Sequence, residues 1–189
     1  MLVQQFFVDG LAHISYLLGG TESCAIIDPK RDVDDYIAAA EEEGLQITHI
    51  LETHLHADFV SGHMDLAEKT GAAIYAPKAG KCAFDHVAVS EGDEIEIEDM
   101  VIRVLDTSGH TAGGLSFHCR QAGVVIVGDA VFLDSVGRCD IPGGDFDRLI
   151  ANIRRNLLSL PPETRVLSGH GPETTIGREA RHNGFLRAS

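Results

Sequence analysis

The sequence predicts an α/β fold in which β-sheets pack together and helices cover them. Apolar runs of strand length come in groups, and amphipathic helical segments lie between the groups instead of alternating strictly with single strands. Polar residues of the metal-binding type also recur directly after several of the apolar runs. Because loops at the ends of rigid strands are where sites are usually assembled, these residues are candidates for a shared site.

The expected strands are short runs rich in β-branched and aliphatic residues. They cover residues 15–20, 24–29, 47–53, 94–99, 101–106, 114–119, 124–129 and 164–169. Three helices are also expected. The first, residues 33–44, has Asp32 as its N-cap, and it ends in a glycine, as does the second, residues 62–71. The third runs over residues 146–158 with Asp145 as its cap.

Length and composition indicate one domain, residues 1–189, because this length with 44% apolar content suffices for one buried core but not for two ordinary domains. The formal net charge of −14 argues against nucleic acid or an anionic membrane as a partner, since both reward clustered Lys and Arg. Residues 1–99 carry 5 basic and 20 acidic side chains, whereas residues 100–189 carry 10 and 9. The second half could therefore still meet a small anion locally.

The four cysteines form no C-x-x-C pair, which argues against a zinc ribbon or a disulfide framework and favours a reduced, cytoplasmic protein. The N-terminus shows no basic region followed by an apolar one, and the longest apolar runs are strand-sized. We therefore expect neither an export signal nor a membrane span.

Several residues at the ends of the expected strands have side chains that bind metals. They are His54, His110, Asp129 and His170. His54 and His56 are spaced so that their rings project to the same side of an extended segment, and Asp58 continues the alternation. Imidazole and carboxylate suit zinc or iron. The isolated histidines are expected to be surface or hydrogen-bonded core residues: His13, His49, His63, His86, His118 and His182.

Four motifs follow one another along the chain: T-H-x-H-x-D from Thr53, S-G-H-T from Ser108, G-D-A from Gly128 and S-G-H-G from Ser168. In this order they resemble the metallo-β-lactamase superfamily over nearly the whole chain. The resemblance implies a four-layer αββα sandwich with a metal site at one edge of the sheets. It also implies two sets of ligands: His54, His56 and His110 for a first metal, with Asp129 bridging, and Asp58 and His170 helping to bind a second.

Phe59 departs from the superfamily motif, which reads H-x-H-x-D-H and uses its last histidine as a ligand of the second metal. Phenylalanine has no lone pair to donate, so a second site would be left with Asp58, His170 and a share of Asp129. We therefore expect an enzyme with a single metal ion. An inactive scaffold is the alternative, but all the other ligand positions are present.

The first half of the chain, including H-A-D-F-V-S-G at residues 56–62, resembles the persulfide dioxygenases, particularly the bacterial group associated with rhodanese domains. That resemblance implies one Fe(II) whose ligands are two histidines and a carboxylate, which leaves positions open for dioxygen and substrate. The implied ligands are His54, His110 and Asp129. The reaction would oxidise glutathione persulfide to sulfite and glutathione. His56 would lie beside the metal, as a ligand or as a hydrogen-bond partner.

The second half, at residues 127–145 and 167–186, is similar instead to short glyoxalase II-like hydrolases. That resemblance implies cleavage of glutathione thioesters such as S-lactoylglutathione by a hydroxide bound to zinc or manganese. Asp58 would then orient or deprotonate the attacking water. A third class, redox or electron-transfer proteins with a di-iron centre, is disfavoured because the chain has no flavodoxin-like segment.

The remaining assignments concern side chains around the expected metal. In the dioxygenase hypothesis Asp58 and His170 orient water or the ligands. Arg138 either pairs with a carboxylate of the substrate or forms a salt bridge to Asp134 or Asp140. The expected partners are a small-molecule thiol substrate and a functionally linked rhodanese, and a homodimer is a further candidate.

Restoring the missing histidine should restore binding of a second metal. We expect the parent chain to hold about one transition-metal ion and Phe59→His to hold about two, because the new imidazole would complete the second set of ligands. Metal analysis of protein loaded and purified without oxygen measures this, with Phe59→Leu as the control that adds no lone pair. Two tightly held ions in the parent would contradict the expectation.

Overall fold

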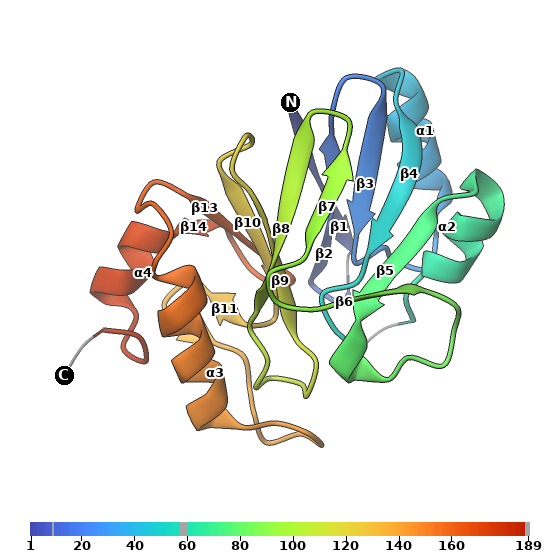
Figure 1. Ribbon diagram of the computed structural model, residues 1–189. Coiled ribbons are helices and arrows are strands. Elements are labelled where there is room, and N and C mark those ends of the chain that lie inside the picture. Colours follow the sequence, from blue (N-terminus) through green and yellow to red (C-terminus); the bar gives the residue numbers. More distant parts are fainter. Residues whose placement is uncertain (9, 57–59, 188–189) are drawn as a thin grey trace.

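Two six-stranded sheets face each other in the computed structural model, which describes residues 1–8, 10–56 and 60–187 (Figure 1). The first sheet has the strand order β1-β2-β3-β4-β5-β6, antiparallel from β1 to β3 and parallel from β3 to β6. Its strands are β1 (Leu2–Val8), β2 (His13–Gly19), β3 (Ser23–Ile27), β4 (Gln46–Leu51), β5 (Ala73–Pro77) and β6 (Val87–Val89).

The second sheet has the order β14-β13-β10-β9-β8-β7, and only its β13–β10 pair is parallel. Its strands are β7 (Glu94–Ile97), β8 (Met100–Asp106), β9 (Leu115–Cys119), β10 (Val124–Gly128), β13 (Arg165–Ser168) and β14 (Thr174–Thr175). A separate small hairpin pairs β11 (Val131–Phe132) with β12 (Ser135–Val136). This hairpin follows directly on the loop after β10.

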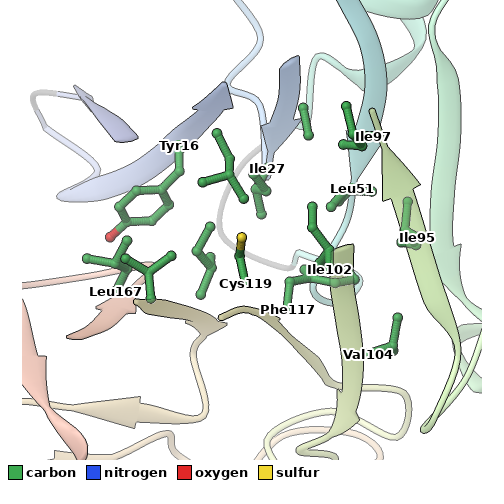
Figure 2. Close-up of a cluster of buried hydrophobic side chains, with 14 of the residues drawn as sticks. Tyr16, Ile27, Leu51, Ile95, Ile97, Ile102, Val104, Phe117, Cys119 and Leu167 are labelled. Atoms are coloured by element: carbon green, nitrogen blue, oxygen red, sulfur yellow. The ribbon is translucent and has the colours of Figure 1, made fainter. Parts of the chain in front are cut away.

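The main core lies between the two sheets. Figure 2 shows Tyr16, Ile27 and Leu51 of the first sheet on one side of this core, with side chains of the second sheet opposite them. Strand alternation explains the arrangement, because Phe117 and Cys119 of β9 point inward while His118 between them faces the other side of the sheet. Packing of these apolar faces holds the sheets together.

Helices cover both outer faces and complete four layers, which confirms the αββα sandwich (Figure 1). Tyr36 and Leu66, on the apolar sides of two helices, pack against the first sheet. Leu149 and Ile176 of two other helices pack against the second sheet in the same way. The helices are α1 (Asp34–Glu42), α2 (His63–Thr70), α3 (Phe146–Asn152) with a π-helical continuation (Ile153–Leu157), and α4 (Ile176–His182), and a 3₁₀ turn spans Lys78–Gly80.

The caps of two expected helices are confirmed and one is wrong. The Asp145 carboxylate accepts a hydrogen bond from the Arg148 N–H at 3.0 Å, and α2 ends at Gly71 in the left-handed region at φ +75°. The expected cap Asp32 is not used, because α1 begins after Val33 without a side-chain cap. The entry to α1 is instead held by the Tyr36 hydroxyl, which accepts from Lys30 N–H at 2.8 Å.

The strand ends that carry the candidate ligands meet at one edge of the sandwich. Two backbone hydrogen bonds join the sheets there, from Ile14 N–H to Gly169 C=O at 2.7 Å and from Leu115 N–H to Thr53 C=O at 2.8 Å. The sheets are therefore fixed relative to each other where the site is built. All four cysteines have free thiols. No helix in the described part of the chain is long and apolar enough to cross a membrane.

Truncating the core between the sheets should destabilise the whole sandwich. Phe117 is 1% exposed, so we expect Phe117→Ala to lower the free energy of unfolding by about 3–5 kcal/mol. Phe7→Ala removes the same atoms from a side chain that is 58% exposed and should cost far less. Denaturant unfolding followed by circular dichroism measures both, and equal losses would contradict this account of the core.

Candidate metal centre

Three side chains from both sheets converge at this edge. His54 follows β4, His110 lies between β8 and β9, and Asp129 follows β10. One ligand atom from each lies within 4.8 Å of the other two. The rings of His54 and His110 have centroids 5.3 Å apart and an interplanar angle of 78°. The donor set of two imidazoles and one carboxylate fits a transition-metal ion.

A chain of hydrogen bonds determines which nitrogen of His54 carries the proton. The Thr53 hydroxyl lies 2.7 Å from Asp28 Oδ2 and must donate to it, because an ionised carboxylate can only accept. The same hydroxyl oxygen can then accept from His54 Nδ1–H at 2.8 Å. The lone pair of His54 Nε2 consequently remains available for a metal ion.

The other two candidate ligands are oriented in a similar way. His110 Nδ1–H donates to the carbonyl oxygen of Arg138 at 2.7 Å, so its Nε2 also keeps a lone pair. That Nε2 lies 3.8 Å from Asp129 Oδ2. The second oxygen of Asp129 is 3.0 Å from His170 Nδ1. The structure thus brings His170 to the trio through Asp129, and each of the three residues of the trio is held by a further hydrogen bond.

The electrostatics of the pocket favour the protonation states that bind metals. Burial, with a further contribution from the positive charge of His56, lowers the pKa of His54 to about 4. Burial alone would raise the pKa of Asp129, but the hydrogen bond from His170 and the neighbouring histidines lower it below its ordinary value. At neutral pH the site therefore offers a neutral imidazole and an ionised carboxylate.

His56 forms hydrogen bonds on the other side of His54. Its Nε2 lies 3.2 Å from Asp28 Oδ1 and 3.1 Å from Glu52 Oε2, and its ring centroid is 4.2 Å from that of His54. Burial disfavours its charge, but the two carboxylates raise the pKa of His56 above its ordinary value. Asp28, His54 and His56 also lie close enough to form a group of metal-binding type. Both oxygens of Asp28 are, however, already hydrogen-bond acceptors.

Three residues that organise the site were not predicted from the sequence: Asp28, Glu52 and Thr53. Asp28 and Glu52 are buried carboxylates, and each comes directly after a first-sheet strand, as the predicted ligands do. That shared position is the signal that could have found them. His13 is a hydrogen-bonded core residue as expected, with Nε2 2.9 Å from the Asp28 carbonyl oxygen. The predicted residues Asp58 and Phe59 lie outside the described residues.

Two glycines permit close contact between the loops of the site. Gly128 has φ +51°, and a Cβ there would collide with the Thr53 hydroxyl. A Cβ on Gly169 would collide with Asp129 Oδ1. The hydrogen bonds of Thr53 and Asp129 therefore depend on the absence of side chains at these positions.

A cavity of about 550 Å³ opens beside His110 and Asp129. Its other lining residues come from the β11–β12 hairpin and the loop after it: Phe132, Ser135, Val136, Arg138 and Ile141. Of the two salt bridges considered for Arg138, the structure shows the one to Asp140, with contacts of 2.8 and 2.9 Å. Asp134 pairs with Arg178 instead. The volume lies in the range of small-molecule sites.

The four layers and the histidine–carboxylate site at their edge define a metal-binding αββα protein. The sequence profile of the metallo-beta-lactamase superfamily matches residues 8–170. The chain therefore belongs to the metallo-β-lactamase superfamily, which confirms the resemblance seen in its motifs.

Individual relatives with different names are similar to the chain. ETHE1 from Myxococcus xanthus has 32% identity and a TM-score of 0.92, with 97% of this chain and 84% of that one covered. Hydroxyacylglutathione hydrolase GloC from Haemophilus influenzae has 31% identity over 88% of this chain and 89% of its own length. TTHA1623, solved in a di-iron-bound form, has 33% identity and a TM-score of 0.85, with 97% and 100% covered.

Removing the hydroxyl of Thr53 should weaken metal binding without removing a ligand. In Thr53→Val the His54 Nδ1–H loses its acceptor and the Asp28 carboxylate loses a donor, so we expect metal affinity to fall by about 10–100-fold. Thr53→Ser keeps the hydroxyl and should retain the parent affinity. Competition with a coloured chelator measures both variants, and equal affinities for Val and Ser would contradict the proton assignment.

Proposed function

We propose that the protein is a mononuclear iron(II) persulfide dioxygenase that oxidises glutathione persulfide to sulfite and glutathione. The observation that carries this proposal is the trio of His54, His110 and Asp129 beside an open cavity. Two histidines and one carboxylate on one face of an iron leave positions for dioxygen and a substrate sulfur. The motif H-A-D-F-V-S-G at residues 56–62 supports the same reaction through its resemblance to persulfide dioxygenases.

The residues of the site would hold and orient the iron. His54 and His110 would bind through Nε2, because their Nδ1 hydrogens are donated to Thr53 and to the Arg138 carbonyl. Asp129 would bind through Oδ2, while His170 holds its other oxygen. His56 serves as a hydrogen-bond partner of Asp28 and Glu52 in this proposal. When bound, the iron would supply the electron transfer that lets dioxygen react with a persulfide.

The cavity would bind the thiol derivative with its terminal sulfur beside His110 and Asp129. Phe132 and Val136 give it an apolar wall that excludes water, and Arg138 at its rim is our candidate partner for a substrate carboxylate. The overall reaction takes up dioxygen and water and releases sulfite and glutathione. The terminal sulfur is thereby oxidised and dioxygen is reduced. Holding both reactants in one cavity supplies the proximity that this reaction needs.

The proposal of one iron rests on the sequence at the second-metal position. Phe59 stands where the superfamily motif has a histidine ligand, and an aromatic hydrocarbon cannot replace it. The di-iron form of TTHA1623 is a property of that relative. In this chain His170 contacts Asp129 in the described part of the site, which supports a role in orienting that carboxylate.

Thioester hydrolysis is the second candidate function. Similarity to the hydroxyacylglutathione hydrolase GloC and the glyoxalase II-like segments at residues 127–145 and 167–186 favour it. The same trio would then hold zinc or manganese, and Asp58 would orient the attacking water. The two candidates differ in one requirement, because hydrolysis needs no dioxygen.

Oxygen consumption separates the two reactions. We expect the iron(II)-loaded protein to take up dioxygen when glutathione persulfide is added and to form sulfite, measured with an oxygen electrode and a sulfite assay. His110→Ala removes a ligand and should reduce the rate by about a hundredfold or more, whereas His182→Ala, which truncates an exposed histidine, should leave it unchanged.

The control reaction is cleavage of S-lactoylglutathione without oxygen, with zinc or manganese supplied. Rapid cleavage under these conditions, together with no persulfide-dependent oxygen uptake, would overturn the dioxygenase proposal in favour of the hydrolase.

A further inference from the structure

A second groove lies on the outer face of the second sheet, away from the candidate metal centre. It has a volume of about 600 Å³, and its basic lining residues are Arg103, His118 and Arg120. Residues of β7, β8 and β9 line it, and these three strands lie side by side in the sheet (Figure 1). The loop at residues 159–161, which follows the π-helical turn, forms another part of its wall.

Strand register places the basic side chains together. Arg103 of β8 is paired directly with His118 of β9, so both side chains stand on the same face of the sheet. Their sequence neighbours Ile102 and Phe117 point into the core between the sheets, which leaves the groove as the direction open to Arg103 and His118. Arg120 follows β9 and lines the same groove.

His118 is a largely buried side chain whose ring reaches the surface of the groove. It is 6% exposed and lines the groove, and its ring nitrogens form no hydrogen bond with any residue that the structure describes. Burial, followed by the charges of Arg120 and Arg103, lowers the pKa of His118. A neutral imidazole keeps one N–H donor, so the position facing His118 is suited to a ligand that accepts a hydrogen bond.

The two arginines also lack counterions. Within the described chain neither Arg103 nor Arg120 forms an ion pair, whereas Arg165 is paired with Glu173 and Arg178 with Asp134. Glu94, the cross-strand neighbour of Arg103, also lines the groove but forms no ion pair with either arginine in the described structure, so the lining carries two guanidinium charges against one carboxylate. The concentration of arginines here is unusual in a chain with a net charge of −14.

We propose that this groove binds the phosphate group of a small molecule. Guanidinium groups bind phosphate oxygens through paired N–H donors, and a neutral His118 can add one more. Val101, Leu160 and Pro161 form an apolar wall that suits an organic body attached to the phosphate. Glu94 also lines the groove and would accept from a hydroxyl or amino group of that body. The volume is sufficient for a phosphate monoester of nucleotide size.

The groove and the metal centre lie at opposite ends of β9. Arg120 directly follows the last residue of this strand, and His110 lies in the loop that leads to its first residue, Leu115. Five strand residues separate the two ends by roughly 16 Å. Arg103 and Arg120 therefore have no place in the metal-binding machinery, and their substitution is expected to leave metal content and oxygen uptake unchanged.

Isothermal titration calorimetry of the metal-loaded protein tests the proposal with three probes: inorganic phosphate, adenosine 5′-monophosphate and adenosine. We expect the monophosphate to bind, inorganic phosphate to bind more weakly, and adenosine not to bind. Arg103→Gln and Arg120→Gln should each raise the Kd for the monophosphate by about tenfold or more, because each removes a charge-assisted contact.

Matched controls separate this groove from other phosphate-binding positions. Arg181→Gln removes the same charge from an exposed position outside the groove, and Arg138→Gln removes it beside the metal centre; both should leave the Kd unchanged. Phosphate binding that depends on Arg103 and Arg120 but is not strengthened by the nucleoside would assign free phosphate as the ligand of the groove. Absence of binding at millimolar probe, or the same Kd in the Arg103 and Arg120 variants as in the parent, would overturn the proposal, as would equal effects of all four substitutions.

Discussion

The buried carboxylate of Asp28 is the interaction on which the rest of the site depends. It accepts from the Thr53 backbone N–H and hydroxyl, both at 2.7 Å, and from His56 at 3.2 Å. A buried charge would be costly without such donors. The backbone of Asp28, at φ +51°, is also in a conformation that few residues other than glycine adopt. The hydrogen bonds offset the cost of burying the charge, and through them one side chain fixes the loop after β4 and, by way of Thr53, the proton of His54.

The ligand trio further depends on how the two sheets are held together. His54 belongs to the first sheet, whereas His110 and Asp129 belong to the second, so no single sheet contains the donor set. The inner core presses the sheets together, but apolar contacts are not directional. The backbone hydrogen bonds between Ile14 and Gly169 and between Leu115 and Thr53 add the direction that packing lacks. The position of the sheets relative to each other, and with it the geometry of the ligand trio, is consequently fixed at this edge.

The sequence predicts the positions of the metal ligands but not the hydrogen bonds that orient them. The positions of His54, His110, Asp129 and His170 were predictable, because each follows an apolar run and strand ends share an edge. The roles of Asp28 and Thr53 were not predictable. Asp28 acts through a hydrogen bond to Thr53, which is distant in sequence, and no local pattern shows that Thr53 rather than another acceptor binds the neighbouring His54. Asp28 nevertheless occupies a strand end and so satisfied the rule that identified the ligands.

Helices and strands with strong local sequence signals were predicted, whereas elements without such signals were not. Expected elements with strong local signals, such as α2 with its C-terminal Gly71 and α3 with Asp145, were confirmed. β1 was missed because it is an edge strand whose side chains are only partly buried, so its sequence does not show a continuous apolar run. The N-terminus of α1 differs from expectation because the Tyr36 hydroxyl accepts from the Lys30 N–H and fixes the chain where a cap by Asp32 was expected.

Charge links the candidate centre to the kind of substrate proposed for it. Asp28 and Glu52 face His56, whose raised pKa favours the cationic form, so one of the two negative charges on that side of His54 is compensated and one remains. Within the trio Asp129 is the single carboxylate, and the two imidazoles are neutral ligands. A divalent ion held by them would retain a net positive charge inside a chain whose overall charge is −14. The centre would then attract a small thiolate or persulfide anion locally, while the acidic surface repels larger polyanions. A compact sulfur anion that reaches the cavity beside Phe132 thus fits the electrostatics of the site better than a large acidic substrate does.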